Sequence, residues 1–156
     1  MSRKLSLAAA LGALALPAMF LASPAMAATC SATVESTDAM KYTTTSLVVP
    51  ASCKQFTVTL KHVGKLPKTV MGHNFVLGKT ADIGGINADG MKAGAAANYV
   101  KPGDTRVIAS SKVIGGGEST TVKIPVGKLK AGGQYSYVCT FPGHSAIMKG
   151  TLKLGS

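Results

Sequence analysis

Near its C-terminal end, the chain has the sequence YSYVCTFPGHSAIM over residues 135–148. Apolar and polar residues alternate up to Cys139, so this segment is expected to be a strand that holds the thiol on the same face as Tyr135 and Tyr137. An imidazole and a thioether follow on one short loop. Thiolate and thioether are soft ligands and imidazole is borderline, and one Cys with two His and a weak axial Met suits electron-transferring copper. The stretch therefore predicts that Cys139, His144 and Met148 bind copper.

The second histidine of such a site is found far upstream. His73 enters an apolar run, MGHNFVL at 71–77, and is expected at the start of a strand. Because it precedes Cys139 by 66 positions, only strand pairing can bring the two side chains together. On the residues alone, two other interpretations remain open. Zinc also accepts Cys and His, and a Cys–His pair could serve a hydrolase, although no oxyanion arrangement is recognisable and Met148 would have no role.

Period-two alternation dominates the rest of the chain, as in Phe56-Thr57-Val58-Thr59-Leu60. Half-buried strands have this pattern, and further strands are expected at 42–49, 73–77, 106–109, 121–126, 135–139 and 150–154. Seven or eight short strands predict an all-β fold, a β-sandwich. Pro125 lacks a ladder donor, so its strand is expected at an edge or a bulge. The irregular, Gly- and Ala-rich segment 80–99 predicts one short, frayed helical excursion outside the sandwich.

The N-terminus is typical of a secretory signal peptide. Arg3 and Lys4 precede an apolar run at 7–22, and a small-x-small cleavage signal ends at Ala27. The apolar run is short for a membrane span. We therefore expect residues 1–27 to be cleaved and residues 28–156 to form one exported domain without membrane insertion.

Three cysteines lie in the exported part: Cys30, Cys53 and Cys139. In an oxidising compartment two of them can pair while one is left over. Cys139 is the one with ligand neighbours. Cys30 and Cys53 are therefore expected to form a disulfide, typically worth about 2 to 4 kcal/mol through its constraint on the unfolded chain.

The net charge of the chain indicates which classes of partner are favoured. The whole chain has a formal net charge of +11, and loss of two of its 17 basic residues with the signal peptide leaves 15 against 6 acidic ones, or +9. Nucleic acid is not indicated as a partner, because the lysines are scattered, arginine is nearly absent and no aromatic residues are interleaved with them. The positive surface instead favours steering toward an acidic partner, which acts on association rate more than on fold.

Taken together, these segments resemble the azurins, the bacterial periplasmic blue copper proteins of the cupredoxin family, over nearly all of the mature chain. The resemblance rests on Cys30 and Cys53, on KQFTV (54–58), LPK (66–68) and VMGHN (70–74), and on CTFPGHSA (139–146) with MKGTL (148–152). The Cys-x4-His-x3-Met spacing differs from that of plastocyanin-like relatives, in which the gap from Cys to His is shorter. The resemblance implies a Greek-key, cupredoxin-like sandwich with one type 1 copper ion, acting as an electron carrier and not as an enzyme.

The resemblance also implies roles for individual residues. The equatorial ligands would be His73, Cys139 and His144, with Met148 as a weak axial ligand and the Gly72 carbonyl as a weaker opposing contact. Outside them, Asn74 would tie the two ligand-bearing loops together, and the amide of Phe141 would hydrogen-bond the Cys139 sulfur; such contacts hold geometry and tune potential. His62 corresponds to a buried histidine whose protonation is linked to redox state, although a purely structural imidazole is equally consistent with the sequence.

An apolar patch around the exposed edge of His144 would be the electron port. Its members would be Met40, Met71, Met91, Phe141, Pro142, Gly143, Ala146 and Ile147. Redox proteins such as c-type cytochromes, copper nitrite reductase or a periplasmic dehydrogenase would dock there as the copper cycles between Cu(I) and Cu(II). The chain departs from the family at Phe75, where many azurins have Trp, and in its stronger positive charge. The alternative function is periplasmic copper storage or delivery, although such proteins usually have exchangeable Met- or His-rich clusters.

Overall fold

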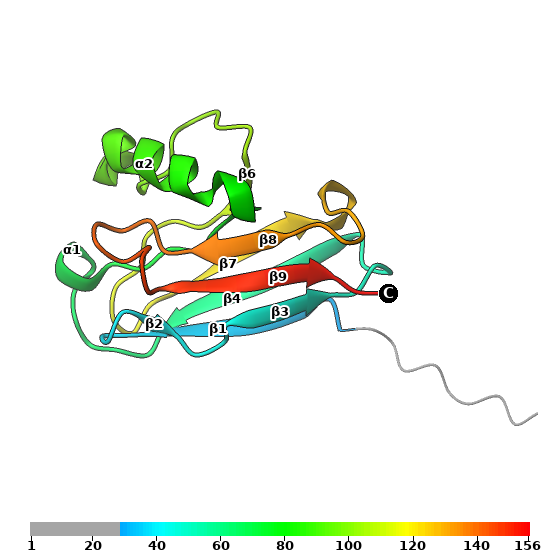
Figure 1. The fold of residues 1–156 in the computed structure, drawn as a ribbon. Helices are drawn as coiled ribbons and strands as arrows, with labels where there is room; N and C mark the ends of the chain where they lie inside the picture. Colours follow the sequence, from blue (N-terminus) through cyan, green and yellow to red (C-terminus); the bar gives the residue numbers. More distant parts are fainter. Residues whose placement is uncertain (1–28) are drawn as a thin grey trace, which may run out of the picture.

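Two β-sheets packed face to face form the body of the protein (Figure 1). The structure is a computed structural model that describes residues 29–156; the predicted signal peptide, 1–27, lies outside the described residues. The strand orders are β2-β1-β4-β7 in one sheet and β3-β9-β8-β5-β6 in the other. The predicted all-β, Greek-key sandwich is confirmed, with nine strands in residues 29–156 where the sequence pattern predicts seven or eight.

The four-stranded sheet contains β1 (Ser31–Thr37), β2 (Lys41–Tyr42), β4 (Gln55–His62) and β7 (Ser119–Pro125). Strand β4 lies at its centre, parallel to β1 and antiparallel to β7. Phe56, Val58 and Leu60 alternate along β4 and are buried, because side chains two residues apart on a strand share a face. Pro125 is the last residue of the edge strand β7, as its missing donor predicts.

The five-stranded sheet contains β3 (Ser46–Val49), β5 (Val76–Lys79), β6 (Val107–Ser110), β8 (Tyr135–Val138) and β9 (Lys149–Leu154). Strand β3 runs parallel to β9, and the other neighbours are antiparallel. The single strand predicted over 42–49 is divided: Tyr42 ends β2 in one sheet, and Ser46 begins β3 in the other. Residues 43–45 thus carry the chain between the sheets, so one predicted strand is two, and β1 is a further strand that none of the predicted ranges covers.

An aromatic cluster fills the core beneath the ligand-bearing loops. The rings of Phe75 and Tyr137, both fully buried, stack with centroids 4.7 Å apart and an interplanar angle of 16°. The hydroxyl of Tyr42 donates a hydrogen bond to the carbonyl of Asn74. Phe75 therefore lies in a closely packed core directly next to Asn74 and His73.

The predicted helical excursion is α2 (Ile83–Ala93), flanked by the short 3-10 turns η1 (Thr80–Asp82) and η2 (Ala95–Ala97). It lies outside the sandwich, over the five-stranded sheet (Figure 1). Although α2 is rich in glycine, Ile86 is buried beneath it, and Arg106 bonds both Asp89 of α2 (2.7 Å) and Asp104 (2.6 Å). Tertiary contacts thus offset its weak intrinsic propensity.

Two further short turns, α1 (Lys68–Met71) and η3 (Val126–Lys128), have no counterpart in the sequence prediction. Strand β5 begins at Val76, so His73 precedes the strand that the pattern predicts it to begin. Among residues 29–156, no helix combines the length and the apolar character needed to cross a membrane. The predicted disulfide between Cys30 and Cys53 is present and ties the start of β1 to the residues before β4.

Candidate metal centre

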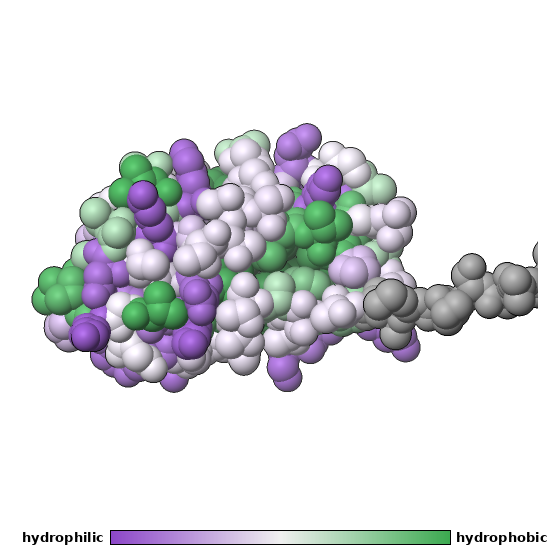
Figure 2. All heavy atoms as spheres, turned by 90° about the horizontal axis from the view of Figure 1, so that it is seen from below, coloured by the Kyte–Doolittle hydropathy of each residue, from purple (hydrophilic) through white to green (hydrophobic). Residues whose placement is uncertain are grey.

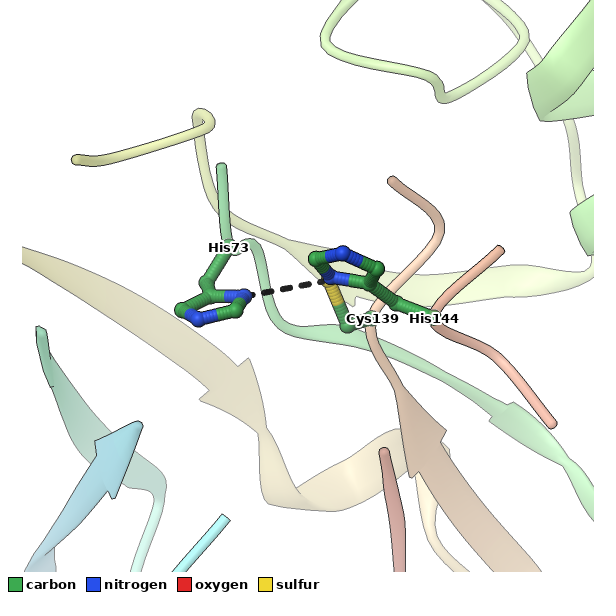
Figure 3. Close-up of side chains that lie close together, drawn as sticks. All are labelled: His73, Cys139 and His144. Carbon is green, nitrogen blue, oxygen red and sulfur yellow. Dashed lines mark hydrogen bonds between the residues drawn. The ribbon is translucent and has the colours of Figure 1, made fainter. Parts of the chain in front are cut away.

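Three donor side chains converge at the end of the sandwich that carries α1. Cys139 directly follows β8, His144 lies on the loop between β8 and β9, and His73 lies just before β5 (Figure 3). The sulfur of Cys139 is 3.6 Å from Nδ1 of His144 and 3.9 Å from Nδ1 of His73. The three ligand atoms all lie within 4.8 Å of one another, and all three residues are buried. The strands thus bring together residues that are 66 positions apart.

The donor distances fit a single metal ion. With bonds of about 2.3 Å to sulfur and 2.05 Å to nitrogen, trigonal angles place S and N about 3.8 Å apart and tetrahedral angles about 3.6 Å apart. The observed 3.6 and 3.9 Å agree with both arrangements. These bond lengths are those of zinc, so distance does not single out copper, and the choice of metal depends on the donor set and on the protein family.

The ring of His73 is held in one orientation before any metal binds. Its backbone exchanges two hydrogen bonds with Ile114, of 2.9 and 2.8 Å, in an isolated bridge. Its Nε2 lies 2.9 Å from the carbonyl of Thr37, which can only accept, so Nε2 carries the proton. The lone pair is thereby left on Nδ1, the atom that faces Cys139.

The loop 139–148 closes on itself through its backbone. The amide of Met148 donates to the carbonyl of His144 at 2.8 Å, which completes one helical turn, and the amide of Cys139 donates to the carbonyl of Met148 at 3.0 Å. Gly143, with φ of 81°, supplies the left-handed residue at the tip. Met148 is fully buried beside Cys139 in the fold, and its role as axial ligand stays a prediction.

Gly72 brings a carbonyl oxygen up to the sulfur. The Cys139 thiol lies 3.8 Å from the Gly72 oxygen. A Cβ atom at position 72 would meet the Lys68 carbonyl at 2.5 Å, Val113 at 2.6 Å and the Phe141 ring at 2.7 Å. Only glycine lets the chain pass this close to α1 and to the loop 139–148.

The side chain of Asn74 joins the segment that bears His73 to the segment that bears Cys139. Its Oδ1 accepts from the amide of Thr140 at 2.8 Å, and its Nδ2 donates to the Thr140 hydroxyl at 2.8 Å. Nδ2 also donates to the carbonyl of Asn98 at 2.8 Å. Asn74 and Thr140 are fully buried, so these bonds are made away from competing water.

Comparison with known proteins identifies the family. The model of the copper binding proteins, plastocyanin/azurin family, matches residues 28–155. This chain belongs to the plastocyanin/azurin family. It is 63% identical over 129 residues to Azurin-2 of Alcaligenes xylosoxydans xylosoxydans, a match that covers 83% of this chain and 100% of that protein. It is 62% identical over 133 residues to an azurin of Achromobacter denitrificans, covering 85% and 89% of the two chains.

A solved structure agrees with this membership. The azurin Az-iso2 from Methylomonas sp. strain J is 53% identical and superposes with a TM-score of 0.80, covering 83% of this chain and 100% of that one. Copper is accordingly the metal indicated for the His73, Cys139 and His144 cluster of this plastocyanin/azurin family member. The zinc and hydrolase interpretations receive no such support.

Burial sets the protonation of the three candidate ligands in this member of the family. It lowers the pKa of His73 to about 4, and it is also the main cause that lowers the pKa of His144. Burial raises the pKa of the Cys139 thiol to about 11, although hydrogen bonds from the amides of Asn74 and Phe141 act in the opposite direction. At neutral pH both imidazoles are therefore neutral, with lone pairs available to a metal.

His62 lies directly behind His73, with ring centroids 4.3 Å apart. Its Nε2 is 3.0 Å from Oδ1 of Asp38, and within residues 29–156 its buried Nδ1 has no hydrogen-bond partner. Asp38 also accepts from the amide of Lys65 at 2.8 Å, which is the largest cause that lowers the pKa of its carboxyl group. The link between His62 protonation and redox state stays a prediction.

The residues predicted to form the apolar patch differ widely in exposure. Ile147 and Met91 are 58% and 41% exposed, whereas Phe141 is 9% exposed. Met40 and Met71 are half-buried, and Pro142, Gly143 and Ala146 are exposed. Val70 of α1, which the sequence analysis does not single out, is 60% exposed next to Met71. Figure 2 shows apolar side chains separated by polar ones at the left of the view, the end where α1 lies in Figure 1.

Several residues that shape the centre escape prediction from the sequence. Thr37 contributes only a backbone carbonyl, and Thr140 and Asn98 are polar loop residues of common types. Ser111 accepts from the amide of Phe75 at 2.9 Å and is equally inconspicuous. No local signal marks these residues, because their roles arise from the packing of distant segments.

Proposed function

We propose that this chain is a one-electron carrier in which His73, Cys139 and His144 are the in-plane copper ligands. Met148 serves as the weak axial ligand and the Gly72 carbonyl as the opposing contact. The observation that carries the proposal is the buried cluster of three donor atoms within 4.8 Å of one another, already held in place by hydrogen bonds. Copper, when bound, supplies the Cu(I)/Cu(II) couple.

Rigidity is the property that favours electron transfer over other copper functions. The proton on Nε2 of His73 is fixed by Thr37, and Asn74 fixes Thr140 next to Cys139. Donors that are held this way move little when the metal changes oxidation state, so little reorganisation accompanies each transfer. A storage or delivery protein needs ligands that exchange readily, and buried, bonded donors oppose exchange. We accordingly propose that the chain performs no substrate chemistry.

The neighbours of the ligands take supporting roles in this proposal. Asn74 holds the two ligand segments in register, and the amide of Phe141 hydrogen-bonds the Cys139 sulfur. His62 is the candidate for a proton whose binding is linked to redox state, because its ring lies against His73 and one of its nitrogens is unbonded within residues 29–156.

Electrons would pass through the edge of His144. Phe141 packs on the His144 ring, with centroids 4.8 Å apart, and Ile147 and Pro142 are exposed on the same loop. His144 is 3% exposed, and its Nδ1 faces Cys139, so only the edge of the ring that carries Nε2 is left for a partner to approach. A partner that covers this loop would approach the metal through a single ring.

We further propose that the partner presents an acidic surface to this end. Five exposed lysines lie on segments next to the centre and make no ion pair within residues 29–156: Lys41, Lys65, Lys68, Lys112 and Lys149. Lys68 begins α1, Lys149 follows Met148, and Lys41 pairs with Thr37. Nearby acidic groups are occupied, since Asp38 is bonded to His62 and two amides. A c-type cytochrome, a copper nitrite reductase or a periplasmic dehydrogenase with carboxylates around its redox centre would meet these requirements.

Export to the periplasm, with cleavage after Ala27, completes the proposal. The Cys30–Cys53 disulfide supports it, because such bonds persist in oxidising compartments. Mass spectrometry of the protein isolated from a bacterial periplasm tests this directly. An N-terminus at Ala28 is expected, and retention of residues 1–27 in the soluble fraction would contradict it.

Addition of Cu(II) to the metal-free protein tests the function. We expect one ion per chain, an intense blue colour that reductant bleaches and oxidant restores, and full retention of copper over repeated cycles. A colourless complex would overturn the ligand assignment. Loss of copper to a chelator in each reduced phase would instead favour storage or delivery.

A charge-reversal series tests the partner surface. The rate of electron transfer to an acidic c-type cytochrome should fall as ionic strength rises from about 0.01 to 0.15 M, because the Debye length shrinks from about 30 to 8 Å. Lys68→Glu should reduce the low-salt rate, whereas Lys128→Glu, in η3 and outside the segments that hold the centre, should change it little. Equal effects of the two variants would contradict a localised docking surface.

A further inference from the structure

The end of the helical excursion folds back onto the metal centre from outside. Asn98 follows η2 with φ of 54° and ψ of 30°, in the left-handed region. Residues with a Cβ rarely adopt this conformation, and asparagine is among the few that tolerate it. The amide of Asn98 donates to the carbonyl of Ala95 at 2.9 Å, which closes the turn. This turn is what directs the two acceptor groups of Asn98 toward the sandwich.

Both acceptors of Asn98 accept hydrogen bonds from segments that hold His73 in place. Its backbone carbonyl accepts from Nδ2 of Asn74, the residue after His73, at 2.8 Å. Its side-chain Oδ1 accepts from the amide of Val113 at 2.9 Å. Val113 precedes Ile114, which forms the isolated bridge with His73. One residue therefore bonds to both chain segments that hold this histidine.

The bond to Asn74 reaches the thiol ligand as well. Nδ2 of Asn74 is shared between the Asn98 carbonyl and the Thr140 hydroxyl, and this fixes the amide plane so that Oδ1 faces the Thr140 amide. Without the carbonyl of Asn98, the Asn74 amide would be held from one side only, by Thr140. Cys139 directly precedes Thr140. A rotation of the Asn74 side-chain amide would therefore displace the Thr140 backbone and, with it, the segment that bears the sulfur.

Tyr99, the residue after Asn98, connects this turn to the surroundings of His144. It also has a positive φ, 54°, and its ring meets the edge of Phe141 with centroids 5.4 Å apart at 74°. Phe141 in turn packs on His144. The segment that ends the excursion thus touches the surroundings of His73, Cys139 and His144, although it contributes no ligand.

We propose that Asn98 is a positioning residue of the metal centre, which clamps Asn74 and Val113 and thereby fixes the relative placement of His73 and Cys139. The helical excursion is then part of the site and not an appendage. The proposal rests on the proposed function only for its copper readouts. The clamp itself belongs to the metal-free protein and can be measured there.

Three substitutions separate the two bonds from general destabilisation. Asn98→Val removes the side-chain acceptor and disfavours the left-handed turn, because a β-branched residue fits it poorly. Asn98→Gly keeps the turn and the carbonyl bond to Asn74 but loses the bond to Val113. Gly94→Ala is the matched control: it strains a residue with φ of 75° in the same segment, where an added Cβ has no neighbour within 4 Å.

Amide hydrogen exchange of the metal-free protein is the first readout. In Asn98→Val, the amides of Thr140 and Val113 should exchange at least about tenfold faster relative to the amide of Val58 in β4, which reports global unfolding. In Asn98→Gly only the Val113 amide should do so. In Gly94→Ala neither should change relative to Val58. Equal acceleration of all three amides in Asn98→Val would overturn the clamp.

The copper-loaded protein gives the second readout. Asn98→Val should shift the visible absorption and the copper hyperfine splitting. Asn98→Asp should give the values of the unsubstituted protein, because its carboxylate keeps the acceptor. Gly94→Ala should leave both unchanged. A spectrum of Asn98→Val identical to that of Gly94→Ala would refute positioning of the metal. If the unsubstituted protein does not turn blue, the proposed function fails, while the exchange data still decide the role of Asn98.

Discussion

Replacement of Asn74 by alanine tests how much of the stability of this end of the sandwich depends on one side chain. The change removes three hydrogen bonds, each 2.8 Å long: two buried bonds to the Thr140 amide and hydroxyl, and one part-buried bond to the Asn98 carbonyl. At about 1 kcal/mol per bond, the free energy of unfolding should fall by about 3 kcal/mol. A domain of this size loses about 3 to 5 °C of Tm per kcal/mol, so Tm should drop by about 10 °C.

Thermal unfolding of the metal-free protein, followed by circular dichroism, measures this change without interference from copper. Asn87→Ala in α2 is the control, because Asn87 is half-buried and its side chain makes no hydrogen bond within residues 29–156. It should not lower the free energy of unfolding, and should raise it by at most about 0.7 kcal/mol, because alanine has a higher helix propensity than asparagine. A loss below about 1 kcal/mol for Asn74→Ala, or one equal to the control, would refute the reasoning.

A double-mutant cycle with Thr140→Val makes the test specific. Both residues share the bond between Nδ2 and the hydroxyl, so the two costs should fall short of additivity by at least about 0.5 kcal/mol. Additive costs would mean that the bond between Nδ2 and the hydroxyl contributes nothing to stability, and that any cost of Asn74→Ala comes from its bonds to the Thr140 amide and the Asn98 carbonyl or from packing.

Three other outcomes follow from the structure. Cys139→Ser should abolish the blue colour while far-UV circular dichroism stays unchanged, and an unfolded variant would count against the site assignment. Replacement of both Cys30 and Cys53 by alanine should cost roughly 3 kcal/mol by urea denaturation, as expected for a disulfide that spans 23 residues. The side chain of Arg106 is the main cause that lowers the pKa of Asp104 to about 2 from 3.8. This carboxyl therefore stabilises the fold above about pH 4 and loses that effect as pH falls toward 2, so Tm should decline less over that range in Asp104→Asn than in the unsubstituted protein.

The sequence predicts the elements of the sandwich better than their division between sheets. Alternation identifies strands such as β4 and β7, because burial of one face leaves a periodic signal. It carries no information on which sheet a strand joins, and residues 42–49 look continuous although Tyr42 and Ser46 belong to different sheets. Local composition also understates α2, whose glycines are compensated by the Arg106 pairs, contacts that no local pattern encodes.

The donor residues are visible in the sequence, whereas the groups that orient them are not. Soft and borderline ligand types at Cys139 and His144 are unusual enough to indicate a metal. The orientation of His73 depends on a carbonyl of Thr37, and every residue type has a carbonyl. Likewise Asn98 acts through a left-handed backbone conformation, which the Ala-rich sequence around it does not predict. These roles follow from tertiary packing alone.

The distribution of donors along the chain limits how strongly copper can protect the folded state. Cys139, His144 and the proposed axial ligand Met148 fall within ten residues, so an unfolded chain keeps all three in one flexible peptide that can still capture a metal ion. A ligand stabilises a protein only by the difference between its affinities for the native and the unfolded chain. Only strand pairing brings His73 to the other donors. His73 and the fixed geometry of the site therefore raise the affinity of the native chain above that of the unfolded chain. Copper should therefore also bind the unfolded chain, through residues 139–148. The folded protein should then gain less stability from copper than its own affinity for the ion would give.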